Sequence, residues 1–249
     1  MIAASPRVLI VDDDAVSLAF LLKAVERCGC EAIGAADAAG ATARLQVEHA
    51  DLLMIDRRMP GIDGTALLRE LRTLGVQAPA VATSAELDQA ATAALLRAGF
   101  ADTLLKPADL ATIQRLLLRF VTPVATAPHR CAVAIESAES TALLDDAAAL
   151  IAIGGDHIAL RALRVLFANE LDDAAIGTAD PADAEQRRAV IERLHRMRAS
   201  CRICGAPALG SATQQYERAL REESNDVASA RAVFLQTYSA TRQALAAVS

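Results

Sequence analysis

Residues 8–14 read VLIVDDD and residues 52–56 read LLMID, so two short apolar runs each end directly in aspartate. Apolar runs of this length without polar alternation are typical of strands buried on both faces, as in a parallel sheet. Between such runs lie stretches with helical periodicity. This alternation predicts a doubly wound parallel sheet of five strands with helices on both faces. The strands are expected at residues 7–11, 30–35, 52–55, 80–82 and 103–105, and the helices at 15–28, 37–48, 64–73, 86–98 and 109–120.

Polar side chains stand at the carboxyl ends of four of these five strands. Asp12–Asp14 follow the first strand, Asp56 the third, Thr83 and Ser84 the fourth, and Lys106 the fifth. The carboxyl ends of parallel strands meet at one edge of the sheet, where open α/β folds bind their ligands. Crowded carboxylates repel each other and favour a hard divalent cation such as Mg²⁺. The pattern predicts a site in which Asp56 is a nucleophile for a phosphoryl group.

Lys106 and Thr83 complete the predicted chemistry. The ammonium group would stabilise phosphoryl charge, and the hydroxyl would donate to a phosphoryl oxygen. Taken singly, the residues have simpler readings: Asp12–Asp14 as helix caps, Asp56 as the start of a turn, and Lys106 as a solvated side chain. Their joint occurrence at four strand ends favours the site.

Four motifs in order, VLIVDDD, LLMIDRRMPGIDG, VATSAE and LLKP, resemble the receiver domain of two-component response regulators. The resemblance covers residues 6–121. It implies that Asp56 accepts phosphate from a phosphohistidine, and that Asp13, Asp56 and the backbone carbonyl of Arg58 bind Mg²⁺, with Asp12 acting through water. Thr103 departs from the pattern, because many receivers have an aromatic switch residue there. The side chain of Arg58 occupies a variable position near the phosphoryl group.

The second half of the chain has a different pattern. Residues 122–140 begin with VTPVATAPHR and predict a linker between a first domain at 1–121 and a second at 141–249. Residues 131–140 are open to two interpretations, a short apolar anchor or more linker. Beyond residue 141 only helical stretches are expected, which predicts an all-α four-helix bundle. These stretches are 141–152, 156–174, 182–203, 206–222 and 226–247.

His195 stands apart from the other three histidines because arginines cluster around it. Apolar Met197, Cys201 and Cys204 follow it at helical spacing, which predicts a buried face opposite and leaves His195 near the edge, toward solvent. A neutral imidazole attacks phosphorus, and nearby guanidinium groups hold phosphoryl oxygens. Cys201 and Cys204, with two residues between them, are also compatible with metal or redox chemistry, but their helical spacing favours two core thiols.

Residues 195–206, HRMRASCRICGA, resemble the motif of the histidine-containing phosphotransfer (HPt) domain. The resemblance covers residues 141–249. It implies that His195 carries phosphate and that Arg198 and Ser200 stabilise it. Arg198 replaces the usual lysine and keeps its charge, whereas Ala199 replaces a glycine that lets a receiver approach closely. The expected fold class is therefore an α/β flavodoxin-like doubly wound sheet followed by an all-α bundle.

The leading hypothesis is a phosphorelay protein whose partners are a sensor histidine kinase and a receiver or HPt domain. No glycine-rich ATP site is visible, so we expect a phosphotransfer protein and not an ATP-dependent enzyme. The alternative is a receiver-controlled interaction module without phosphotransfer by His195, and self-association as a homodimer stays open. The net charge of −6 and the absence of tryptophan disfavour nucleic-acid binding. No apolar run is long enough for a membrane span, so we expect a cytoplasmic protein.

Overall fold

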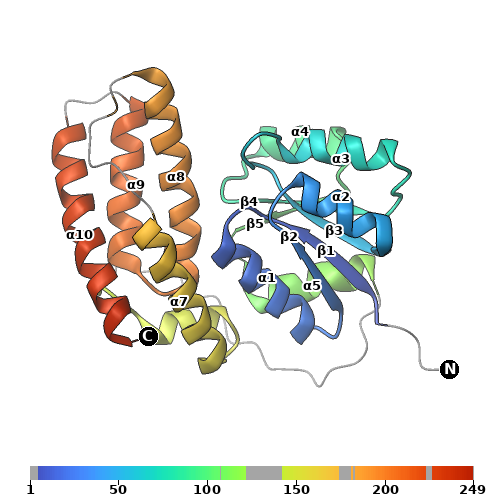
Figure 1. Ribbon diagram of the computed structural model, residues 1–249, viewed down its shortest axis with the longest axis horizontal. Coiled ribbons are helices and arrows are strands. Elements are labelled where there is room, and N and C mark those ends of the chain that lie inside the picture. Colours follow the sequence, from blue (N-terminus) through green and yellow to red (C-terminus); the bar gives the residue numbers. More distant parts are fainter. Residues whose placement is uncertain are drawn as a thin grey trace. The chain divides into compact units, whose positions relative to one another are not determined.

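The computed structural model describes residues 5–106, 108–121, 142–173, 181, 183–222 and 226–248 (Figure 1). The chain divides into two compact units, Met1–Cys131 and Ala132–Ser249. The predicted linker at 122–140, together with its ambiguous segment, lies outside the described residues. Each unit is therefore described by itself.

The first unit contains the predicted five-stranded parallel sheet, which confirms the α/β flavodoxin-like expectation for this part of the chain. Its strand order is β2-β1-β3-β4-β5, so the order reverses between β1 and β3. The register pairs Asp56 at the end of β3 with Thr83 on β4. The strands are β1 (Arg7–Val11), β2 (Glu31–Ala35), β3 (Leu52–Asp56), β4 (Ala80–Ser84) and β5 (Asp102–Leu105).

Helices cover both faces of this sheet (Figure 1). They are α1 (Ala15–Arg27), α2 (Ala38–Val47), α3 (Gly64–Thr73), α4 (Gln89–Arg97) and α5 (Leu110–Phe120). Each begins at an aspartate whose carboxylate accepts a hydrogen bond from the backbone amide three residues later. Such a cap stabilises a helix by about 1 kcal/mol. Asp14 is the cap of α1, so the third aspartate of VLIVDDD has a structural role and only Asp12 and Asp13 remain for the predicted site.

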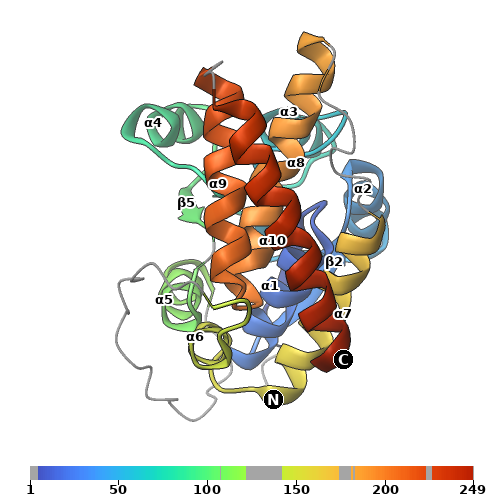
Figure 2. The same ribbon diagram turned by 90° about the vertical axis from the view of Figure 1, so that its left-hand side faces the viewer.

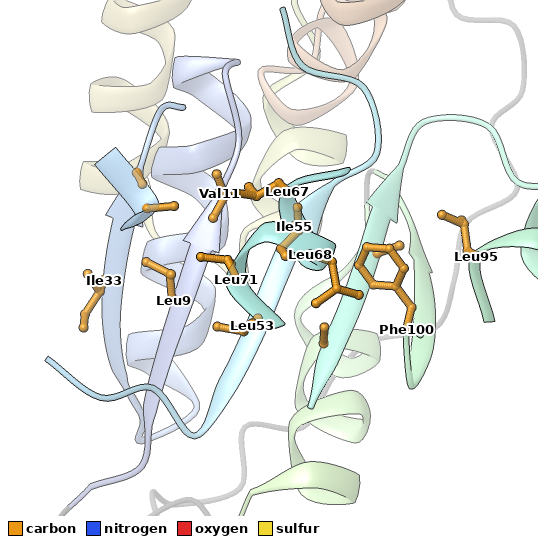
Figure 3. Close-up of a cluster of buried hydrophobic side chains, with 14 residues drawn as sticks. Leu9, Val11, Ile33, Leu53, Ile55, Leu67, Leu68, Leu71, Leu95 and Phe100 are labelled. Carbon is orange, nitrogen blue, oxygen red and sulfur yellow. The ribbon is translucent and has the colours of Figure 1, made fainter. Parts of the chain in front are cut away.

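The core under α2, α3 and α4 is built from alternate residues of the strands (Figure 3). Leu9 on β1 and Leu53 on β3 pack with Leu67 and Leu71 of α3, and all four are fully buried. Strand residues of the other parity, such as Ile10, are equally buried on the opposite face. Burial on both faces explains why the strand sequences are continuous apolar runs.

The described part of the second unit is helical. Its elements are α6 (Asp146–Ala152), α7 (His157–Asp173), α8 (Ala184–Ile203), α9 (Pro207–Glu222) and α10 (Val227–Val248). Helix α9 packs against both α8 and α10, and α10 packs against α7 (Figures 1 and 2). Among the described helices, none is both long and apolar enough to cross a membrane.

Gly205 forms the corner between α8 and α9. Its φ of +67° is in the left-handed region that favours glycine, and its carbonyl accepts a hydrogen bond from the amide of Asp145 at 2.7 Å. A Cβ atom at this position would lie 2.3 Å from the Asp145 carbonyl oxygen. The corner therefore needs glycine to receive the segment that leads into α6.

Candidate functional site

The carboxyl ends of β1 and β3 bring three aspartates together. One carboxylate oxygen each from Asp12, Asp13 and Asp56 lies within 4.8 Å of the others. Asp12 is fully buried and Asp56 is 7% exposed. The structure thus gathers the three predicted carboxylates at one edge of the sheet, as the alternation of strand and helix requires.

Lys106, directly after β5, reaches back across the sheet to this cluster. Its ammonium nitrogen donates to Asp12 Oδ2 at 3.0 Å and to Asp56 Oδ2 at 2.9 Å. Its backbone amide donates to the carbonyl of Ser84 at 2.7 Å, which fixes the root of the side chain beside β4. Burial alone would lower the pKa of Lys106, but the two carboxylates outweigh it and raise the pKa. The side chain is therefore a permanent cation at neutral pH.

Asp56 is held in an environment that disfavours its charge. Burial is the largest influence on its pKa and raises it, Lys106 lowers it, and Asp12 raises it, so that the pKa is about 6. At neutral pH the carboxylate is mostly ionised and available as a nucleophile.

Asp12 has partners that fix its orientation. Its Oδ2 accepts a hydrogen bond from the Ser17 hydroxyl at 2.6 Å, and its Oδ1 accepts one from the backbone amide of Asp14 at 3.1 Å. Ser17 was not predicted as a site residue, although its place in the first turn after VLIVDDD was a signal for it. A buried carboxylate oriented by three donors keeps its position when a ligand enters.

Thr83 presents a buried hydroxyl next to Asp56. The residue is 1% exposed, and its Oγ1 has no hydrogen-bond partner among the described residues. Buried hydroxyls are normally paired, because an unmade hydrogen bond costs about 1–3 kcal/mol. A phosphoryl oxygen on Asp56 would supply an acceptor, since Thr83 is the register partner of Asp56.

Gly64 keeps the end of β3 in close contact with the start of α3. A Cβ atom on Gly64 would lie 2.4 Å from the Asp56 carbonyl oxygen. The amide of Gly64 donates to the carbonyl of Arg57 at 2.9 Å. The motif's final glycine therefore holds the backbone of the candidate phosphoacceptor in place.

The charges of the cluster fit a divalent cation. Three carboxylates and the ammonium of Lys106 leave an excess of about two negative charges when all are ionised. Hard oxygen ligands of this kind suit Mg²⁺. The backbone amide of Arg58 donates weakly to Asp56 Oδ1 at 3.4 Å, which places the Arg58 backbone beside the cluster. Asp12, Asp13, Asp56 and the Arg58 carbonyl are therefore the groups that would hold the ion.

In the second unit, His195 lies on α8 against the carboxylate of Glu217 on α9. The expectation that His195 lies near solvent stays a prediction. The predicted buried face is present, since Met197, Cys201 and Cys204 are also buried and both cysteines are free thiols. Beyond this apolar face, α9 places a carboxylate against His195.

That carboxylate belongs to Glu217 on α9. His195 Nδ1 is 3.3 Å from Glu217 Oε1, and Arg198 donates to Oε2 at 3.1 Å. Arg221, one turn further along α9, donates to Oε1 from two nitrogens, at 2.7 and 3.2 Å. Burial acts to raise the pKa of Glu217, but the hydrogen bonds from His195, Arg221 and Arg198 outweigh it and lower the pKa to about 2. Neither Glu217 nor Arg221 was predicted.

Ser200 faces a different neighbour. It is fully buried, and its hydroxyl donates to Glu170 Oε2 on α7 at 3.1 Å. Arg198, by contrast, shares Glu217 with His195. Of the two predicted phosphate-stabilising residues, the structure places Arg198 in the cluster around His195 and gives Ser200 a link between α7 and α8.

Comparison with known proteins identifies the family of the first unit. Residues 8–118 match the family described as the response regulator receiver domain. These residues are a receiver domain. The receiver is also 36% identical over 118 residues to the transcriptional regulatory protein PrrA of Mycobacterium tuberculosis, a match that covers 46% of this chain and 51% of PrrA.

A second kind of relative extends beyond the receiver. The sensor histidine kinase GacS of Pseudomonas protegens is 31% identical over 229 residues, which cover 88% of this chain and 25% of GacS. The chain thus spans about a quarter of the length of this relative, and the match includes residues of the helical unit. Among solved structures, the Francisella response regulator 1452 receiver domain aligns with 28% identity over 47% of this chain and 96% of that chain, with a TM-score of 0.44.

Proposed function

We propose that the chain is a phosphorelay protein in which the receiver accepts phosphate on Asp56 and the helical unit, a four-helix bundle of the HPt type, carries phosphate on His195. The observation that carries the proposal is the single ammonium of Lys106 bonded to both Asp12 and Asp56. It supplies a fixed positive charge at the carboxylate that attacks.

In the receiver step, a carboxylate oxygen of Asp56 attacks the phosphorus of a phosphohistidine on a partner protein. A P–O bond forms as the P–N bond breaks, and the imidazole leaves and takes up a proton. The ammonium of Lys106 and the hydroxyl of Thr83 hold the oxygens of the transferred group. Mg²⁺, bound by Asp12, Asp13, Asp56 and the Arg58 carbonyl, would neutralise the remaining negative charge during transfer.

In the helical unit, Glu217 fixes which nitrogen of the His195 ring carries the proton. A proton on Nδ1 donated to Glu217 Oε1 puts the lone pair of the neutral imidazole on Nε2, which is the nitrogen that attacks phosphorus. Arg198 lies one turn from His195 and provides a guanidinium for the phosphoryl oxygens. The proposed partners are a sensor histidine kinase and a receiver or HPt domain, in the cytoplasm.

Phosphate labelling of the full chain tests both steps. With Mg²⁺ and labelled acetyl phosphate, we expect an acyl phosphate that base hydrolyses and that is absent from Asp56→Asn. With a labelled partner receiver, we expect an acid-labile phosphohistidine that is absent from His195→Gln and retained in His157→Gln, a matched control at an exposed histidine on α7. Labelled ATP alone should give no product.

The same experiment separates the alternative. If His195→Gln exchanges phosphate as the unchanged chain does, the helical unit is an interaction module controlled by the receiver. If His195→Gln loses the label, an unchanged circular dichroism spectrum shows that the variant is folded and that the loss is not caused by misfolding.

A further inference from the structure

The side chain of Arg58 forms an ion pair above the candidate phosphoacceptor. Its Nη2 lies 3.6 Å from Glu86 Oε2, and the two side chains are 43% and 42% exposed. Arg58 follows Asp56 by two residues, and Glu86 follows Thr83 by three. Since Asp56 and Thr83 are register partners on neighbouring strands, the ion pair connects the loops that leave those two strand ends.

Both members of the pair are anchored to the site through the backbone. The Arg58 amide donates to Asp56 Oδ1 at 3.4 Å. On the other side, Ser84 Oγ donates to the Glu86 carbonyl at 2.8 Å and accepts from the Glu86 amide at 3.3 Å. Ser84 is 3% exposed and directly follows Thr83. A phosphoryl group held between Asp56 and Thr83 would therefore lie next to the root of both side chains.

We propose that the Arg58 guanidinium is a phosphoryl-binding group of the receiver, and that Glu86 competes with the phosphoryl group for it. This inference rests on the proposed function of Asp56. A phosphoryl group carries a charge of about −1.5 to −2, against −1 for Glu86, and offers three strong acceptor oxygens. A partly exposed ion pair at 3.6 Å is weak, so the guanidinium exchanges partners at little cost.

The competition has a structural consequence. When Arg58 turns to the phosphoryl group, Glu86 loses its ion pair with the loop after β3, while the hydrogen bonds between Ser84 and the Glu86 backbone stay in place. Arg58 and Glu86 thus transmit the state of Asp56 to the start of α4. The exchange uses side chains in the loops that follow β3 and β4 and does not involve Thr103 on β5.

Binding of beryllofluoride, an anion that occupies the aspartate in place of a phosphoryl group, tests the competition. Isothermal titration calorimetry of the full chain with Mg²⁺ gives the affinity for four proteins: the unchanged chain, Arg58→Gln, Glu86→Gln and the double variant. Arg58→Gln keeps the backbone carbonyl proposed to bind Mg²⁺ and should weaken binding about two- to five-fold, as expected for a partly exposed charge. Glu86→Gln should strengthen binding by a similar factor.

The double variant separates competition from a general charge effect. If Glu86 acts by occupying Arg58, the gain from Glu86→Gln falls to less than half in the Arg58→Gln background. Glu48→Gln removes one negative charge from the receiver at the C-cap of α2 and should leave the affinity unchanged. An equal gain in both backgrounds, or no gain, overturns the inference. If the unchanged chain binds no beryllofluoride with Mg²⁺ present, the proposed function of Asp56 fails instead.

Discussion

The two candidate sites have opposite charge arrangements. In the receiver, one buried ammonium on Lys106 lies between the carboxylates of Asp12 and Asp56. In the helical unit, one buried carboxylate on Glu217 is surrounded by His195, Arg198 and Arg221. The first cluster has excess negative charge and needs a further cation before it can hold a phosphoryl group. The second has excess positive charge and can attract such a group without a metal ion.

The largest expected difference between the clusters is the loss of folding stability when one cationic side chain is removed. Lys106→Met should lower the free energy of unfolding of the receiver by about 3–5 kcal/mol in metal-free buffer, because two buried carboxylates lose their cation. Arg198→Met should cost the helical unit only about 1 kcal/mol, since Arg198 is 28% exposed and Glu217 keeps His195 and Arg221. Urea denaturation with hydrogen exchange as the readout gives the free energy of unfolding of each unit separately. Equal losses would contradict the contrast between the two clusters.

A smaller effect is expected from Mg²⁺. At about ten times its dissociation constant, the ion should raise the free energy of unfolding of the receiver by about 1.4 kcal/mol and leave the helical unit unchanged. The same hydrogen-exchange measurement, repeated with Mg²⁺, reports both units in one sample. Asp13→Asn should remove most of the gain, because it deletes one of the three carboxylates. Stabilisation of the helical unit would show that the ion acts elsewhere.

The two units should also respond to pH in opposite directions. Glu217 has a lowered pKa of about 2 against an ordinary 4.5, so its contribution to stability is complete above pH 4.5 and is lost as the pH falls toward 2. Asp56 has a raised pKa of about 6 against 3.8, so its ionisation disfavours the metal-free folded receiver, and stability falls as the pH rises from about 4 to 6. Denaturation at a series of pH values checks both trends. Glu217→Gln should flatten the first trend and Asp56→Asn the second.

The receiver site could be predicted from sequence because its residues follow apolar strands. Once the strands are known to be parallel, the residues after β1, β3, β4 and β5 must meet at one edge, however far apart they are in the chain. Asp12, Asp56, Thr83 and Lys106 therefore follow from pattern alone. The separate roles of Asp12, Asp13 and Asp14 could not be predicted in this way. The capping of α1 by Asp14 and the hydrogen bond from Ser17 to Asp12 depend on where the helix begins.

The helical site was harder to predict for a physical reason. Helical periodicity shows which face of α8 is apolar, but it does not show which helix covers the remaining faces. Glu217 and Arg221 lie on α9, and nothing in the local sequence of His195 indicates that they meet it. For the same reason the sequence could not show that Ser200 bonds to Glu170, which lies on α7. Packing between helices is decided by side-chain shape over the whole unit.

The reach of Lys106 also bears on when the receiver becomes competent. Its ammonium bonds to residues 94 and 50 positions earlier in the chain, so these contacts exist only after β5 has joined the sheet. A chain emerging from the ribosome, or one whose last strand has detached, still carries Asp12, Asp13 and Asp56 but lacks the ammonium of Lys106 between them. If Asp56 accepts phosphate as proposed, incompletely folded molecules lack the cation that the transfer uses, and only receivers that have finished folding can take part in signalling.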